Sequence, residues 1–246
     1  MTRYTLNVRW SVRRESLEEC AERLWQFMRG IRECHDLFSQ WYEMGESLED
    51  ALSRKVDVLS RQELLNLLAR GRNRRDSDGG IIEELGHSVG IWNGHEGTKG
   101  CNVLAACCRY GERVGNGVSL DLPEELGGFA DPAMASRLLT IAARAWDPDR
   151  GGVVSLEELR AASFVRYTDE AGREVSRMRK LPGPFVDWMV YVSRRLKRIA
   201  SVPSPSTLIP VDDMGVVIVV EPHPPSRDNS EDMKNIRAIE EIVSDL

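Results

Sequence analysis

The chain opens with two elements of opposite periodicity, and together they restrict the fold more than any other part of the sequence. From residue 4 to residue 12, apolar and polar side chains alternate, which is the two-residue period of a strand with one buried face. Ser16 and Glu19 then form a capping box, and from Leu17 to Ile31 the apolar residues recur at helical spacing. The sequence therefore predicts an α+β fold in which this strand lies at or near the edge of a sheet.

Further capping and patterning signals extend this prediction along the chain. Ser47, Ser60 and Asp131 occupy positions typical of helix N-caps. Short apolar runs predict strands at residues 85–92, 102–109, 118–122, 186–192, 208–211 and 216–220. The first three runs would add an antiparallel meander to the opening strand, and residues 236–243 have the pattern of a closing amphipathic helix. We expect a mostly antiparallel sheet with helices packed against it, in a single compact domain spanning residues 1–246 with an irregular connector near 200–207.

Composition and charge limit the classes of partner. The 246 residues carry a formal net charge of −6 and the pI is about 5.4, which argues against a general nucleic-acid binder and favours a basic or metal-bearing partner. The first residues contain no apolar signal segment, and no apolar run approaches the length needed to span a bilayer. We therefore expect a cytoplasmic protein that contacts neither membrane nor nucleic acid directly.

The cysteines give no sign of a cofactor. The chain has five, an odd number, without C-x-x-C spacing and with mostly apolar neighbours. They are Cys20, Cys34, Cys101, Cys107 and Cys108. This pattern is typical of buried, reduced thiols. We expect no structural disulfide, no zinc site and no other cofactor.

One motif has the spacing of a serine hydrolase. Gly86, Ser88 and Gly90 match the G-x-S-x-G pattern of a nucleophile elbow, in which a sharp strand-to-helix turn exposes the serine. Such an elbow needs an apolar strand before it and a helix after it, whereas Glu83 and Glu84 precede this motif and glycine-rich sequence follows it. A hydrolase with Ser88 as nucleophile is the least favoured alternative, and we expect that the protein is not an enzyme.

A second motif has the pattern of a calcium loop. Residues 147–158 align with the twelve positions of an EF-hand loop, in which Asp147, Asp149, Ser155 and Glu158 would be the ligands. The fifth position is a glycine without a side-chain oxygen, and no partner loop is evident. The competing interpretation is an acidic turn, in which Asp147 ends one helix while Ser155 and Glu158 cap the next. Calcium binding through this loop is the alternative function.

Tryptophan-centred segments recur along the chain in a fixed order with other motifs. They are Arg9-Trp10, Trp41-Tyr42, Trp92-Asn93-Gly94, Ala145-Trp146-Asp147-Pro148, and Trp188 with Tyr191. Together with the opening strand and helix, their order and spacing resemble the immunity protein 52 family of bacterial polymorphic toxin systems over nearly the whole chain. The Cys107-Cys108 pair and the glycine-rich residues 149–152 depart from the family pattern.

The resemblance implies an α+β antitoxin encoded beside a toxin that is delivered between bacteria, commonly one with a restriction-endonuclease-like nuclease domain. Binding of this cognate toxin would be the whole function. We expect the motif residues to build the scaffold, because large aromatic side chains dominate core burial. These residues are Trp10, Trp41, Trp92, Asn93, Gly94, Trp146, Pro148 and Trp188. For the toxin contact we predict exposed acidic side chains, which would face a basic nuclease. They are Asp147, Asp149, Glu157, Glu158, Glu124 and Glu125.

Overall fold

Strand β1 (Tyr4–Trp10) is the centre of one large sheet. The computed structural model describes residues 3–111, 114–124, 131–168, 172–178 and 184–245. Within these ranges, ten strands pair in the order β11-β12-β10-β7-β1-β6-β5-β4-β2-β3, and every pairing is antiparallel. β1 lies between β6 (Asn116–Asp121) and β7 (Arg150–Ser155), so the expectation of an edge or near-edge strand was wrong.

Most of the other strands follow the predicted runs, but β7 does not, because residues 147–158 were predicted to form a loop or a turn. The other strands of the sheet are β2 (Trp41–Glu43), β3 (Lys55–Val56), β4 (His87–Trp92), β5 (Asn102–Cys107), β10 (Met189–Ser193), β11 (Thr207–Val211) and β12 (Gly215–Val219). The predicted meander is confirmed as β4, β5 and β6, which joins β1 through β6. β7, the short strands β2 and β3, and a separate hairpin of β8 (Phe164–Thr168) and β9 (Glu174–Met178) were not predicted.

The first four helices begin directly after their predicted N-cap residues, whereas no capping signal predicted the start of the closing helix. They are α1 (Leu17–Arg32), α2 (Leu48–Ser53), α3 (Arg61–Arg70), α4 (Pro132–Trp146), α5 (Leu156–Ser163) and α6 (Ser230–Val243), with short 3-10 turns at Asp36–Phe38, Glu83–Leu85 and Gly97–Lys99. At the start of α1, the Ser16 hydroxyl accepts from the Glu19 N–H (3.1 Å) and the Glu19 carboxylate accepts from the Ser16 N–H (2.7 Å). This mixture of helices and antiparallel strands confirms the α+β fold class.

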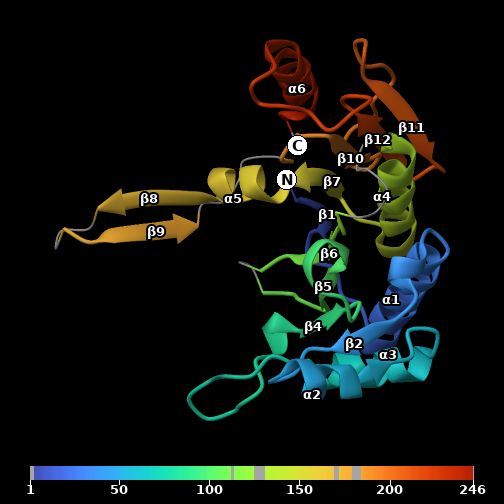
Figure 1. The fold of residues 1–246 in the computed structure, drawn as a ribbon, viewed down its shortest axis with the longest axis vertical. Helices are drawn as coiled ribbons and strands as arrows, with labels where there is room; N and C mark the ends of the chain where they lie inside the picture. Colours follow the sequence, from blue (N-terminus) through green and yellow to red (C-terminus); the bar gives the residue numbers. More distant parts are fainter. Residues whose placement is uncertain (1–2, 112–113, 125–130, 169–171, 179–183, 246) are drawn as a thin grey trace.

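Two apolar clusters hold the layers together. α1, α3 and α4 cover one face of the sheet, and α6 packs on the opposite face against β10 and β12 (Figure 1). The larger cluster contains Trp41, Trp146 and Trp188, each fully buried, and Trp10, which stacks on Trp146 with ring centroids 5.2 Å apart. Trp92 is only half-buried. The tryptophans therefore fix helices α1 and α4 to the central strands.

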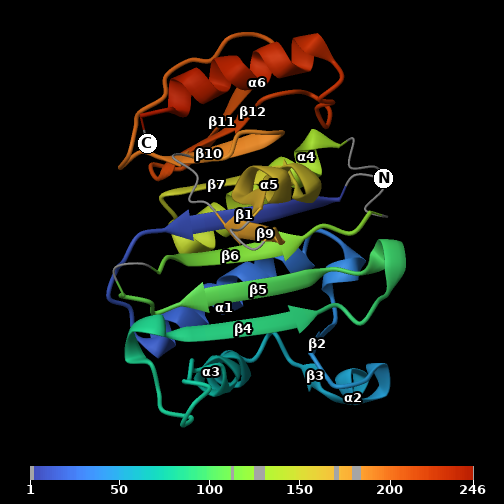
Figure 2. The ribbon, with the colours of Figure 1, turned by 90° about the vertical axis from the view of Figure 1, so that its left-hand side faces the viewer.

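One region of the second sheet face has none of the described helices over it. Figure 2 shows β4, β5, β6 and part of β1 uncovered between α3 and α5. α5 and the β8–β9 hairpin leave the sheet on this same side and extend away from it (Figure 1). Along each of these strands, every second side chain is buried in the main core. The side chains between them point to the opposite face and therefore line this open region.

Asp187 is a buried carboxyl that makes the stability of the fold depend on pH. It is 2% exposed, and one of its oxygens accepts a hydrogen bond from the Ser155 backbone N–H at 2.6 Å, which joins β7 to the segment before β10. Desolvation by burial raises the pKa of Asp187 from its ordinary 3.8 to about 6, although the Ser155 bond opposes the shift. Because the pKa is higher in the folded state than in the unfolded state, folding loses stability as the pH rises from about 4 to about 6.

We expect Asp187→Asn to remove this loss. Asparagine retains an oxygen that accepts from the Ser155 N–H but does not ionise. The free energy of unfolding of the variant, relative to that of the native protein, should therefore rise by up to about 3 kcal/mol between pH 4 and pH 7. Urea titrations of both proteins at closely spaced pH values measure this difference. A difference that stays constant across the interval would contradict the assignment.

Candidate functional site

The Trp146 segment is a structural junction in which its acidic side chains already have partners. Asp147 ends α4 in a left-handed conformation (φ 45°), and its carboxylate pairs with Arg195 at 2.6 Å. Arg13 donates to the carbonyl oxygens of Trp146 (2.6 Å) and Asp147 (2.9 Å), and also pairs with the buried Glu15 at 2.9 Å. These contacts fix the beginning of α1 to the end of α4.

The other acidic side chains that were predicted to contact a partner are dispersed. Asp149 accepts from the Ser11 N–H at 2.7 Å and pairs with Arg195; although burial opposes it, these contacts lower the pKa of Asp149. Glu158 pairs with Arg227 (3.4 Å) and Glu124 with Arg3 (3.3 Å). Glu157 is exposed on α5 and has no ion pair among the described residues, and Glu125 lies outside the described residues. Of the acidic set, Glu157 is the one described side chain whose charge is not already paired.

Residues 147–158 do not form a calcium loop. An EF-hand loop wraps its ligands around one ion, whereas here Arg150–Ser155 is strand β7, paired on both edges. An extended chain rises about 3.3 Å per residue, so Asp149 and Ser155 are separated by roughly 20 Å. The calcium alternative was therefore wrong. The acidic-turn interpretation holds at the two ends, since Asp147 ends a helix and the Ser155 hydroxyl accepts from the Glu158 N–H (3.3 Å).

Ser88 does not lie in a nucleophile elbow either. It is within β4, with strand on both sides, and its hydroxyl contacts the Arg109 guanidinium (2.8 Å) and the Asn73 side-chain amide (3.3 Å). The adjacent His87 alternates to the other face of the sheet, where its Nδ1 faces the Leu68 carbonyl oxygen at 2.8 Å. Without a histidine beside the hydroxyl, Ser88 has no general base, and the hydrolase alternative was wrong.

The uncovered region of the sheet has a floor of small side chains, and we call it the open sheet face. One row of cross-strand partners across β7, β1, β6, β5 and β4 consists of Arg150, Arg9, Gly117, Ala106 and Ser88. The next row consists of Gly152, Asn7, Ser119, Leu104 and Gly90. Residues of both rows, with Arg109, line a shallow depression of about 400 Å³. A flat, shallow floor of this kind fits a protein segment better than a small molecule, which normally binds in a deeper cleft.

Two large side chains lie along this floor because glycines stand beside them. A Cβ atom on Gly117 would be 2.7 Å from the Cδ atom of Arg9, its cross-strand partner. Likewise, a Cβ atom on Gly90 would be 3.0 Å from a methyl carbon of Leu104. Leu104 is nevertheless 52% exposed. The glycines thus keep one guanidinium and one exposed leucine close to the sheet, in positions where a partner can cover both.

Three arginines give the open sheet face a local positive charge. Arg9 is exposed, while Arg109 and Arg150 are half-buried, and no carboxylate of the described chain pairs with any of them. Desolvation and the like charges of Arg109 and Arg150 lower the pKa of Arg9 from its ordinary value. Arginine stays protonated in proteins, so the three guanidinium groups remain mutually repelling cations until an anionic group approaches. The Nε atom of Arg109 is also buried without a hydrogen-bond partner.

The sequence pattern predicted which side chains of β1 and its neighbouring strands lie on the polar side of the sheet. It did not predict that this side is exposed. The alternation at residues 4–12 already assigned Arg9 to the polar side of its strand. That α6 and α5 cover other parts of this face, and leave Arg9 uncovered, depends on tertiary packing. The structure also brings Cys20, Cys107 and Cys108 together, with sulfur atoms within 4.8 Å of one another, which the spacing of these residues did not predict.

Comparison with known proteins identifies a family and a similar fold. The sequence profile of a family described as Immunity protein 52 matches residues 2–245. No curated protein sequence matches the chain significantly. Among solved structures, the fold is similar to the Pseudomonas aeruginosa T6SS protein PA0821, with a TM-score of 0.53 and 12% sequence identity, over 98% of this chain and 72% of that one. None of the described helices is long and apolar enough to cross a membrane.

Proposed function

We propose that this chain, which belongs to the immunity protein 52 family, binds a cognate bacterial toxin in the cytoplasm and blocks its activity. The family match carries the proposal, because it spans residues 2–245 and so includes every element of the fold. A similar fold in a protein described as a T6SS protein supports a toxin that is delivered between bacteria. Neither Ser88 nor the Asp147 segment is arranged for chemistry, which favours a function of binding alone.

The toxin contact that the geometry favours is the open sheet face. Its arginines pair with no carboxylate of the described residues, its floor is flat, and the exposed Leu104 lies within it. Arginine and exposed apolar side chains at the centre of a patch are typical of residues that dominate binding energy. An interface on this face requires no rearrangement of the core, since no helix covers it (Figure 2).

The partner segment that fits this face carries carboxylates. Nucleases that use metal ions hold them with carboxylates in the active site. A guanidinium group pairs with such carboxylates through two parallel hydrogen bonds and can occupy the place of the metal. We therefore propose a nuclease toxin whose acidic active-site segment lies across Arg9 and Arg109.

The net acidity of the chain has a separate part in this proposal. A net charge of −6 attracts a basic nuclease over distances of about a Debye length, roughly 8–10 Å, and so raises the rate of encounter. Contact through Asp147, Asp149, Glu158 or Glu124 would have to replace the ion pairs that these residues already make. Glu157, which is exposed on α5, needs no such exchange. Long-range steering by the acidic residues and short-range contact by the arginines are therefore compatible.

Co-expression with the toxin encoded beside this gene tests the function. We expect growth to be restored when both proteins are produced, and the pair to co-purify as a stable complex. An inactive variant of the same toxin should still co-purify, which separates binding from enzymatic damage. Failure to protect against any neighbouring toxin, without complex formation, would overturn the proposal.

A further inference from the structure

Three cysteine side chains from two distant parts of the chain meet beside the N-terminal end of α1. Cys20 is on the first turn of α1, Cys107 is the last residue of β5, and Cys108 follows it. Their sulfur atoms all lie within 4.8 Å of one another, and those of Cys20 and Cys108 are 2.8 Å apart. Cys20 and Cys107 are fully buried, whereas Cys108 is half-buried.

The backbone at Cys108 has an uncommon conformation that assembles this cluster. Consecutive residues of a strand point to opposite faces, so the Cys107 and Cys108 side chains would ordinarily diverge. Here Cys108 has a φ of 56°, in the left-handed region that non-glycine residues seldom adopt, and its sulfur lies on the same side as that of Cys107. Gly86 permits this arrangement, because a Cβ atom there would be 2.3 Å from the Cys107 carbonyl oxygen. Strained conformations of this kind persist mainly at functional sites.

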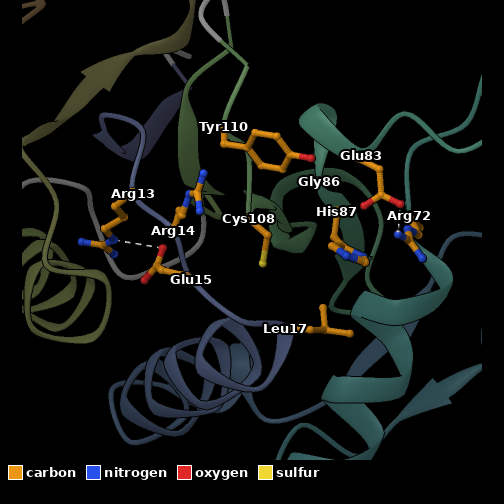
Figure 3. A pocket seen from close by; sticks show the side chains of 10 residues that line it. All are labelled: Arg13, Arg14, Glu15, Leu17, Arg72, Glu83, Gly86, His87, Cys108 and Tyr110. Atoms are coloured by element: carbon orange, nitrogen blue, oxygen red, sulfur yellow. Dashed lines mark hydrogen bonds and ion pairs between the residues drawn. The ribbon is translucent and has the colours of Figure 1, made fainter.

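The cluster opens to solvent through a pocket of about 470 Å³. In Figure 3 the Cys108 side chain points into this pocket, and His87, Arg72, Arg14 and Leu17 stand around it. The arginines and the histidine favour negative charge on the sulfur. An ion from solution can thus reach Cys108 directly and the two buried sulfurs behind it.

The three sulfur atoms are close enough to one another to bind a single cation. The Cys20 and Cys108 sulfur atoms are 2.8 Å apart, so one of them donates a hydrogen bond to the other, and the Cys107 sulfur lies within 4.8 Å of both. Removal of the thiol protons from all three residues would leave three negative charges side by side, two of them fully buried, which is costly unless a cation replaces the protons. Binding of a divalent metal ion supplies that cation and releases the thiol protons to solvent.

A second group of possible ligands, Glu221, His223 and Asp232, lacks this arrangement. Glu221 accepts a hydrogen bond from Asn235 at 2.7 Å, and Asp232 accepts one from the Ser226 N–H at 2.8 Å. These carboxylates already serve the start of α6 and its contact with the sheet. The cysteine cluster alone, within the described part of the chain, combines converging ligands with an entry path.

We propose that Cys20, Cys107 and Cys108 bind a thiophilic divalent metal ion of the Zn²⁺ class. With zinc–sulfur bonds of about 2.3 Å in tetrahedral geometry, the sulfur atoms are about 3.8 Å apart, within the spread of this cluster. Cys20 and Cys108 move apart by about 1 Å on binding, and the fourth coordination position faces the pocket. The ion ties the first turn of α1 to the end of β5, and zinc suits such a site because thiolates select soft and borderline metals.

Titration of the fully reduced protein with Co²⁺, followed by competition with Zn²⁺, tests the site in the absence of any toxin. We expect one ion per chain, a thiolate-to-cobalt charge-transfer absorption, and a higher Tm in the presence of Zn²⁺. Cys108→Ser should lower the Zn²⁺ affinity at least about 100-fold, as should Cys20→Ser and Cys107→Ser, because each removes a direct ligand. Cys34→Ser and Cys101→Ser are matched controls that should bind as the native protein does.

Cys108→Ser is the primary variant because its side chain is partly exposed, and circular dichroism of each metal-free variant verifies folding. Absence of the charge-transfer band in reduced native protein would overturn the proposal. So would binding that survives all three cluster substitutions. A protein that forms a Cys20–Cys108 disulfide, detected as a loss of two hydrogen masses, but binds no Co²⁺ after reduction would also overturn it in favour of an oxidisable thiol pair.

Discussion

Substituting Arg9 and Arg109 together by glutamate abolishes protection in the co-expression assay and lowers the affinity for the cognate toxin at least about 1,000-fold. Loss of one partner from a buried, hydrogen-bonded charge pair costs about 2–5 kcal/mol, and each 1.4 kcal/mol is about tenfold in affinity. Charge reversal adds repulsion against a carboxylate-bearing partner. Isothermal titration or surface plasmon resonance with an inactive toxin measures the change in Kd.

The matched control for this double variant is Arg32→Glu with Arg137→Glu. Both of these arginines are exposed, on α1 and α4, which cover the other face of the sheet. The two double variants change the net charge by the same amount, so a difference between them reports local contact and not long-range attraction. Retained affinity in the Arg9 and Arg109 variant, together with loss in Glu157→Lys, would reject the open sheet face and favour the acidic surface.

The Arg9 and Arg109 double variant should remain folded, so a loss of affinity can be attributed to the contact surface. Arg9 makes no hydrogen bond or ion pair through its side chain within the described chain, and the Arg109 guanidinium bonds to Ser88 alone. Glutamate at these positions therefore leaves no buried charge without its former partner. We expect the double variant to unfold in urea within about 1 kcal/mol of the native protein.

Substituting Trp146 by alanine lowers the free energy of unfolding by about 3–5 kcal/mol, which is a large fraction of the 5–15 kcal/mol typical of a folded domain. Trp146 is fully buried, stacks on Trp10, and lies where α4, α1 and the central strands meet. Its removal leaves a cavity that a rigid sheet cannot close. Urea denaturation followed by circular dichroism measures the shift in midpoint.

Trp25→Ala is the control for aromatic loss at a less buried position. Trp25 is half-buried on α1, contacts the Arg29 and Arg61 guanidinium groups, and donates its indole N–H to the Leu59 carbonyl oxygen at 2.9 Å. We expect a loss of about 1–2 kcal/mol for this variant. Equal losses for the two tryptophans would show that Trp146 is not the junction that its burial indicates.

The sequence predicted the helices better than the centre of the sheet, and strand β7 shows why. Gly151 and Gly152 made residues 147–158 look like a turn, because glycine seldom favours a strand. In the structure these glycines permit close strand contact: a Cβ atom on Gly152 would be 2.5 Å from the Met189 carbonyl oxygen, and one on Gly151 would be 2.7 Å from that of Asn7. The need for glycine at these two positions comes from strands that are distant in the sequence, so it leaves no periodic pattern in residues 147–158.

The candidate contact surface was missed for a related reason. Alternation along β1 places Arg9 opposite the core, but whether a polar face stays uncovered depends on where α5 and α6 pack. Acidic residues near Trp146 were visible in the sequence, whereas their arginine partners, such as Arg195, come from remote elements. The capping boxes succeeded because both partners lie within one turn of helix.

The central position of β1 also determines the stage of synthesis at which the centre of the sheet can form. β1 is translated before residues 116–121 and 150–155, yet it pairs with both of these segments. Until the later segment has been translated, β1 has an unpaired edge, and such high-sequence-separation contacts fold slowly. We therefore expect the open sheet face, whose floor includes β1, β6 and β7, to form only after residue 155 has been translated.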